Sequence, residues 1–185
     1  MSAKPGLSWD ACTLLNLLAT RQEVQILTAL GCPSYVVTEV WQGEVLSLRP
    51  LPEEDPQGNL ITADTSGLLH SGHLIEVSMT LDEQRTFVEF ASQMDDGEAR
   101  SAAIAVHRRL HLVTDDRISL REAQAHLPAI PTMTTPDFMK QWADQASVNR
   151  QTLAEALRRI EVCATYRPRR LHPLWTWWDQ HRIAS

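Results

Sequence analysis

Short apolar runs that alternate with helix-like segments limit most strongly how this chain can fold. The first run, LSW at residues 7–9, is followed by an acid and then by leucines at helical spacing, and the same change of pattern recurs along the chain. We expect strands at residues 7–10, 35–37, 74–79 and 111–114. We expect helices at residues 11–20, 22–30, 38–48, 82–93, 98–109, 117–127, 137–145 and 148–164. Because strands joined through helices run parallel, this order predicts an α/β sandwich with a mainly parallel sheet.

The boundaries of these elements are marked by residues that start or stop helices. Gly31 follows the second helical segment, and Thr38 stands where its side chain can cap the third. Residues 49–59 contain three prolines and a glycine and are expected to form a loop. Residues 128–136 are expected to be a loop or the edge of the sheet.

Length and composition indicate a globular protein with either one hydrophobic core or one domain with an appendage. The 185 residues are 43% apolar and 22% charged, enough for a single hydrophobic core. The first ten residues lack the apolar segment of a signal peptide, and no apolar run of about eighteen residues is present, so we expect no membrane partner. The three cysteines show no C-x-x-C spacing, which predicts a reducing, cytoplasmic setting.

Charge is distributed unevenly along the chain. The net charge of −6 argues by itself against a nucleic-acid partner. Residues 146–185, however, contain seven arginines and three acids, a net charge of +4, which leaves −10 for the remainder. An acidic body with a basic tail fits a metal-holding centre beside a surface for an anionic ligand, and it also fits a solvated tail helix that balances charge.

Acidic side chains stand where the predicted strands end. Asp10 ends the first strand, Asp115 and Asp116 end a later one, Glu98 begins a helix, and Glu44 lies within the helix that follows Thr38. Because the carboxyl ends of parallel strands meet at one edge of the sheet, these acids are expected to converge there. Carboxylate oxygens are the ligands that Mg²⁺ and Mn²⁺ prefer, so the sequence predicts a site for one of these cations.

The segments that carry these acids resemble the four motifs of PIN-domain nucleases. The motif segments are DACTLLNLLAT at 10–20, VVTEVWQGEVLSLR at 36–49, DDGEARSAAIA at 95–105 and LVTDDR at 112–117. The resemblance covers roughly residues 7 to 125. Two positions depart from the usual pattern, with Ala11 where Ser or Thr is common and Glu98 where Asp is common.

The resemblance implies a PIN-like domain over residues 1–130, built as a three-layer sandwich, with a helical C-terminal extension over residues 131–185. It implies a Mg²⁺- or Mn²⁺-dependent endoribonuclease acting on single-stranded RNA, such as the toxin of a toxin–antitoxin pair with an antitoxin-like inhibitor protein. The positions that correspond to the acidic quartet are Asp10, Glu44, Glu98 and Asp116. Asp115 is a second choice as a metal ligand, and the residues expected to contact substrate are Thr114, Arg117 and Arg121.

The segment YRPRRLHPLWTWWDQHR at 166–182 leaves several interpretations open. Its tryptophans can pack back onto the domain, form a homodimer or antitoxin interface, or stack on single-stranded RNA, which is the order in which we expect them. The alternative to a nuclease is an inactive PIN-like interaction module that acts through this segment. A different Mg²⁺-dependent phosphate enzyme is expected least, because Lys4 and Lys140 are the only lysines and neither is near the acids in sequence.

Overall fold

The computed structural model describes residues 4–43, 47–126 and 128–183, with backbone alone for 41–43. Its centre is a five-stranded sheet in the order β5-β2-β1-β6-β7, in which every neighbouring pair is parallel. The sheet strands are β1 (Leu7–Trp9), β2 (Ser34–Val37), β5 (Ile75–Val77), β6 (His111–Val113) and β7 (Thr132–Met133). The predicted α/β class with a parallel sheet is therefore confirmed.

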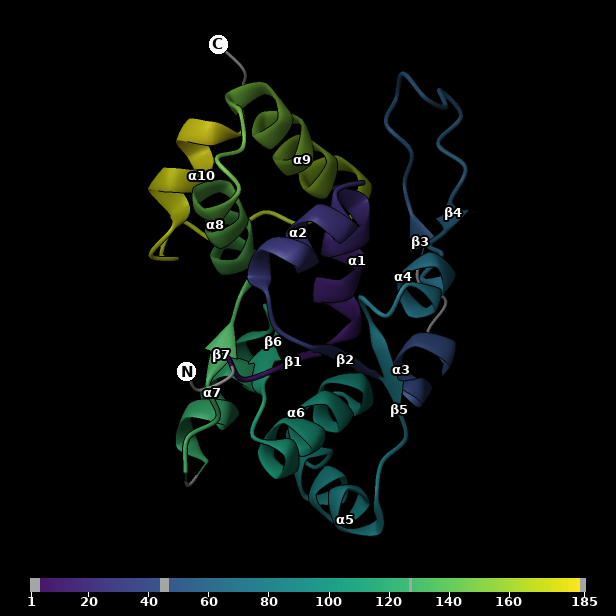
Figure 1. Ribbon diagram of the computed structural model, residues 1–185, viewed down its shortest axis with the longest axis vertical. Helices are drawn as coiled ribbons and strands as arrows, with labels where there is room; N and C mark the ends of the chain where they lie inside the picture. Colours follow the sequence, from purple (N-terminus) through teal and green to yellow (C-terminus); the bar gives the residue numbers. More distant parts are fainter. Residues whose placement is uncertain (1–3, 44–46, 127, 184–185) are drawn as a thin grey trace.

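Helices lie on both faces of this sheet, an arrangement compatible with a three-layer sandwich (Figure 1). On one face α6 (Asp96–Arg108) contacts β1, β2 and β6, and α5 (Leu81–Phe90) packs against α6. On the other face lie α1 (Ala11–Ala19), α2 (Glu23–Leu30), α8 (Thr135–Gln145) and α9 (Arg150–Cys163). The remaining helices are α3 (Thr38–Gly43), α4 (Ser66–His70), α7 (Arg117–Ala125) and α10 (Trp175–His181).

The strands are short apolar runs because both faces of the sheet are covered. Trp9, Val36, Val37, Leu112 and Val113 are all fully buried. The register sets Leu7 beside Ser34 on one side and beside His111 on the other, so β1 is the central strand. Its carboxyl end therefore lies in the middle of the sheet edge.

Local signals account for most helix ends. The Asp10 side chain caps α1, Asp116 caps α7, and Thr80 with Glu83 forms a capping box at the start of α5. Gly31 ends α2 in the left-handed conformation with φ of 64°, where a glycine carries no steric penalty.

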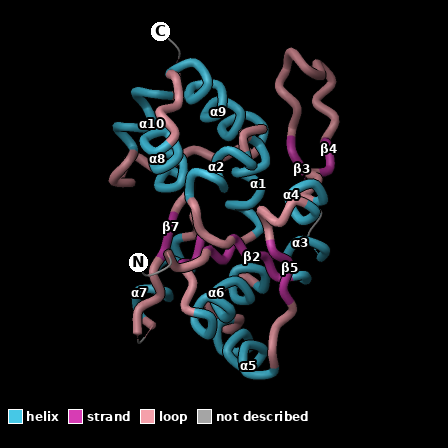
Figure 2. The backbone as a smooth tube through the Cα atoms, in the orientation of Figure 1, coloured by secondary structure: helices cyan, strands magenta, loops and turns pink. Residues whose placement is uncertain are grey.

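The region after Val37 differs from the prediction. A helix was expected over residues 38–48, but α3 ends at Gly43, and Ser47–Leu48 forms the short strand β3. This strand pairs antiparallel with β4 (Ile61–Thr62), and Figure 2 shows the connection between them projecting from the body of the molecule. Next to β3, the Arg49 backbone N–H donates to the Cys163 carbonyl at 2.9 Å, and this hydrogen bond also stabilises the extended segment.

The part of the chain after residue 130 shares the sheet and the core. Strand β7 pairs with β6, and the Phe138 ring of α8 meets Trp9 of β1 edge-on with centroids 5.3 Å apart. Trp178 of α10 is fully buried and donates its indole N–H to Glu161 at 2.9 Å. Trp178 is therefore buried within the C-terminal part of the chain, where its ring also meets Tyr166 edge-on with centroids 6.0 Å apart. None of the described helices combines the length and the apolar character needed to cross a membrane.

Phe138 tests whether α8 stabilises the same core as the central strand. Because its ring is 0% exposed, Phe138→Ala removes buried apolar surface and is expected to lower the free energy of unfolding by about 3–5 kcal/mol. Leu81→Ala, on a side chain that is 74% exposed, is expected to change it by less than about 0.5 kcal/mol. Urea unfolding followed by circular dichroism measures both. Equal stability of the two variants would show that α8 adds nothing to the core.

Candidate active site

Asp10 leaves the carboxyl end of β1 and is almost completely buried, with 1% of its surface exposed. Its Oδ1 accepts hydrogen bonds from the backbone N–H and the hydroxyl of Thr13, both at 2.6 Å. Its Oδ2 is buried without a hydrogen-bond partner among the described residues. Burial raises the pKa of Asp10 to about 6, although polar contacts with Thr114 and Thr13 offset part of the rise.

Glu98 lies in the first turn of α6 and is half-buried. Its Oε2 accepts a hydrogen bond from the Ser119 hydroxyl at 3.0 Å. Burial raises the pKa of Glu98 to about 7, and the negative charges of Asp116 and Asp10 add to the rise. Near neutral pH this carboxyl group is therefore present in both its protonated and its ionised form.

Asp116 ends the loop after β6 and begins α7. Its Oδ1 accepts from the backbone N–H groups of Ile118 at 2.7 Å and Ser119 at 2.8 Å. Because the same Ser119 donates its hydroxyl to Glu98, the two carboxylates lie side by side. Both line an open cavity of about 260 Å³ together with Asp95, Met94 and Ile118.

Asp115 is held by its own set of hydrogen bonds. Its oxygens accept hydrogen bonds from the Tyr166 hydroxyl at 2.9 Å, from the Asn16 amide at 3.1 Å, and from both the backbone N–H and the hydroxyl of Thr135. Burial raises the pKa of Asp115, and the same hydrogen bonds oppose that rise. With its oxygens engaged in this way, Asp115 supports the loop that carries Asp116, and its negative charge adds to the raised pKa of Asp10.

The other predicted site residues are placed as follows. Glu44 lies outside the described residues. Thr114 is buried, and its hydroxyl accepts from the Asp116 backbone N–H at 3.2 Å, so it shapes the loop. Arg117 is exposed at the start of α7, whereas Arg121 forms an ion pair with Glu122 at 2.7 Å.

The group of Asp10, Glu98 and Asp116, which we call the acidic centre, has features that suit a cation. Its donors are hard oxygens, one of them is buried without a partner, and two of its members bind protons more tightly than isolated carboxyls do. Within the part of the chain that the structure describes, however, no three Asp, Glu, His or Cys side chains converge closely enough to hold a metal ion. The donor chemistry fits Mg²⁺ or Mn²⁺, while the described side chains alone do not complete a ligand set.

Comparison with known proteins assigns no family to this chain. No protein-family model and no curated protein matches the chain.

Two supporting residues were not anticipated from the sequence. Ser119 joins Glu98 to Asp116, and its position three residues after a helix-capping acid is a signal that could have revealed it. Tyr166 reaches Asp115 from 51 residues away, and no local pattern indicates such a contact.

The raised pKa of Glu98 can be tested directly. In the metal-free protein Glu98 is expected to titrate near pH 7, and Asp116→Asn is expected to lower that pKa because the variant removes a neighbouring negative charge. Carbon-13 NMR of labelled glutamate side chains measures both values. Asp82→Asn, an exposed acid on α5, is the matched control and should leave Glu98 unchanged. Titration of Glu98 at its ordinary value near 4.5 in wild type would contradict the described arrangement.

Proposed function

We propose that this protein is a divalent-cation-dependent endoribonuclease that hydrolyses phosphodiester bonds of single-stranded RNA. The observation that supports the proposal is the acidic centre at the carboxyl edge of a parallel sheet, in which Ser119 joins Glu98 to Asp116 and the charge of Asp10 acts on Glu98. Open parallel sheets place their active sites at this edge. Structural ion pairs do not account for these side chains, because no described Lys or Arg forms an ion pair with Asp10, Glu98 or Asp116.

Asp10, Glu98 and Asp116 would hold Mg²⁺ or Mn²⁺, and such an ion activates water and neutralises developing charge on a phosphate. Glu44, the fourth expected ligand, belongs to the same proposal. Without the cation Glu98 has a pKa of about 7, so binding of the cation near neutral pH would displace its proton. Arg117, exposed beside Asp116, is available to a phosphate oxygen.

RNA as substrate follows from the resemblance of the four motifs to those of PIN-domain nucleases. The same proposal takes residues 131–185, which also contribute β7 to the sheet, as the C-terminal extension of a PIN-like domain and the cytoplasm as its setting. A narrower form of the proposal is that the protein is a toxin, either a monomer or a homodimer, whose activity an antitoxin-like protein inhibits.

The alternative function is an interaction module that has lost activity. It is favoured by the absence, among the described side chains, of three ligands around one point. In that case the C-terminal segment would act through its exposed residues, since Trp178 is buried.

Cleavage of RNA by site variants tests the proposal. Wild type with Mn²⁺ or Mg²⁺ is expected to cut a single-stranded oligoribonucleotide, and EDTA should stop the reaction. Asp10→Asn and Glu98→Gln are each expected to reduce the rate by roughly 10²-fold or more, because each removes a group that stabilises charge in the reaction. Asp82→Asn, the same change at an exposed position on α5, should keep the wild-type rate. Metal-independent cleavage, or equal rates for all variants, would contradict the proposal.

A further inference from the structure

A second cavity lies at the opposite edge of the sheet from the acidic centre. It has a volume of about 660 Å³ and is bordered by Leu7 and His111, the first residues of β1 and β6. Asp10 and Asp116, in contrast, follow the other ends of these two strands. The cavity shares no lining residue with the one at Glu98 and Asp116. Its volume is typical of sites for small organic molecules, so this amino-edge cavity is large enough for a ligand of its own.

Most of the surface that lines the amino-edge cavity is apolar. Segments far apart in the chain supply it: Pro5, Leu7 of β1, Leu30 at the end of α2, Met133 of β7 and Leu174 before α10. Leu7 and Leu30 are buried, whereas Met133 and Leu174 are half-buried. A ligand with an apolar body would cover this surface and remove it from water, which is the main favourable contribution to binding in such a cavity.

Lys4 supplies the one positive charge of this cavity that no described carboxylate compensates. Two lysines and two aspartates line the cavity. Lys140 pairs with Asp144 at 2.7 Å, and Asp137 accepts hydrogen bonds within the capping box at the start of α8. The Lys4 ammonium instead donates to the neutral carbonyl of Leu30 at 3.1 Å, and it forms no ion pair with any described residue. Its charge is therefore available to a ligand.

The Lys4 ammonium is held beside the cavity. The carbonyl that it binds belongs to the last residue of α2, where the partial negative charge of the helix end attracts an ammonium. Burial raises the pKa of the Cys32 thiol and the charge of Lys4 opposes that rise, so the ammonium lies close to this residue of the same wall. A ligand would thus meet a positive charge that is already in place.

His111 adds an uncharged polar group to the same wall. Its ring is half-buried and forms no hydrogen bond with any of the described residues. Because burial lowers the pKa of His111, the ring is neutral at neutral pH. One uncompensated ammonium, one neutral imidazole and apolar walls match a ligand with a single negative charge. An RNA backbone or a polyphosphate would bring several negative charges and would find no further unpaired cation among the described side chains of this cavity.

We propose that the amino-edge cavity binds a small molecule with an apolar body and one anionic group, of the class of aliphatic carboxylates. The carboxylate would pair with the Lys4 ammonium, and the apolar chain would cover Leu30, Met133 and Leu174. This inference is independent of the proposed function, because it uses no residue of the acidic centre and concerns the opposite edge of the sheet.

NMR signals from within the cavity test the proposal directly. The whole chain is labelled at its methionine methyl groups and histidine rings. Sodium octanoate, 1-octanol or octyltrimethylammonium is then added, and these probes share one alkyl chain and differ in charge. Octanoate is expected to shift the signals of Met133 and His111 saturably. It should bind about 10-fold more tightly than the other two probes, because only octanoate forms an ion pair with Lys4.

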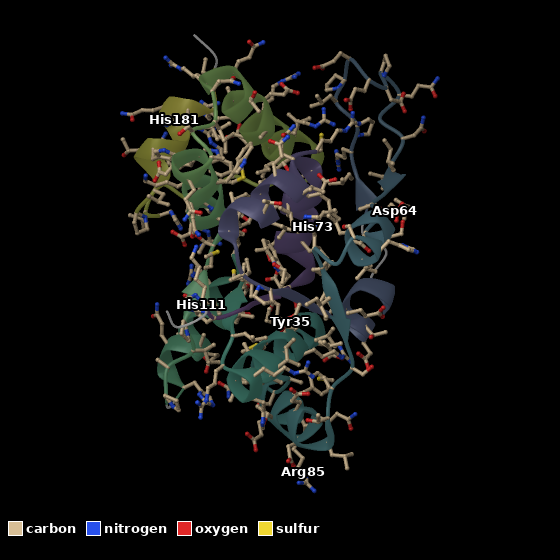
Figure 3. The ribbon with its side chains drawn as sticks, in the orientation of Figure 1. Tyr35, Asp64, His73, Arg85, His111 and His181 are labelled. Carbon is tan, nitrogen blue, oxygen red and sulfur yellow. The ribbon has the colours of Figure 1, made fainter. Side chains whose placement is uncertain are left out.

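Variants of Lys4 separate charge from apolar contact. Lys4→Met keeps a long side chain and removes its charge, so it is expected to bind octanoate about 10-fold more weakly and to lose the preference for octanoate over 1-octanol. Lys4→Arg should retain that preference. The matched control is Arg85→Met, the same loss of charge on α5, and Figure 3 shows Arg85 far from His111. This control should bind octanoate within about twofold of wild type. Circular dichroism checks that each variant is folded.

Two results would overturn the inference. One is that no probe shifts the signals of Met133 and His111 saturably. The other is that all three probes bind equally well and Lys4→Met changes nothing, which would make the cavity an unselective apolar surface. Neither result bears on RNA cleavage, and failure of RNA cleavage does not bear on octanoate binding, so the two proposals are tested separately.

Discussion

The carboxylate of Asp115 joins more segments of this protein than any other described acid near the sheet edge. It accepts hydrogen bonds from Asn16 in α1, from Thr135 at the start of α8 and from Tyr166 after α9. These contacts fix the loop after β6, and the next residue, Asp116, is thereby held beside Glu98. The C-terminal part of the chain thus contributes to the position of the acidic centre although none of the centre's carboxylates comes from it.

The acidic centre itself opposes folding at neutral pH. Asp10 and Glu98 have pKa values of about 6 and about 7, above their ordinary values of 3.8 and 4.5. Between about pH 4 and about pH 7 the folded state therefore holds protons that the unfolded chain has already released. The free energy of unfolding falls as the pH rises through this range, because the two carboxyl groups must then lose their protons inside the folded protein. A bound cation would replace those protons. Retention of such a cluster is typical of sites where function, rather than stability, selects the residues.

Sequence patterns predicted the elements whose signals are local. The apolar runs of β1, β2, β5 and β6 and the helices α5 to α9 were found because burial and capping leave a mark within a few residues. The pair β3–β4 was missed, because the extended state of Ser47–Leu48 depends on a partner at Ile61–Thr62. At the site, the rule for parallel sheets placed Asp10, Glu98 and Asp116 at one edge. The hydrogen bond between Asp115 and Tyr166 was not predictable, because the two residues are 51 positions apart in the chain.

Calorimetric titration with Mn²⁺ near pH 6 tests the central claim, that the acidic centre binds a divalent cation. Wild type and Asp10→Asn/Asp116→Asn are titrated in two buffers of different ionisation enthalpy, which reveals proton release. The account predicts that wild type binds Mn²⁺ and releases protons, since Asp10 and Glu98 are partly protonated at this pH, and that the variant does neither. A folded wild-type protein that binds no Mn²⁺, or a variant that binds it equally well, would contradict the account.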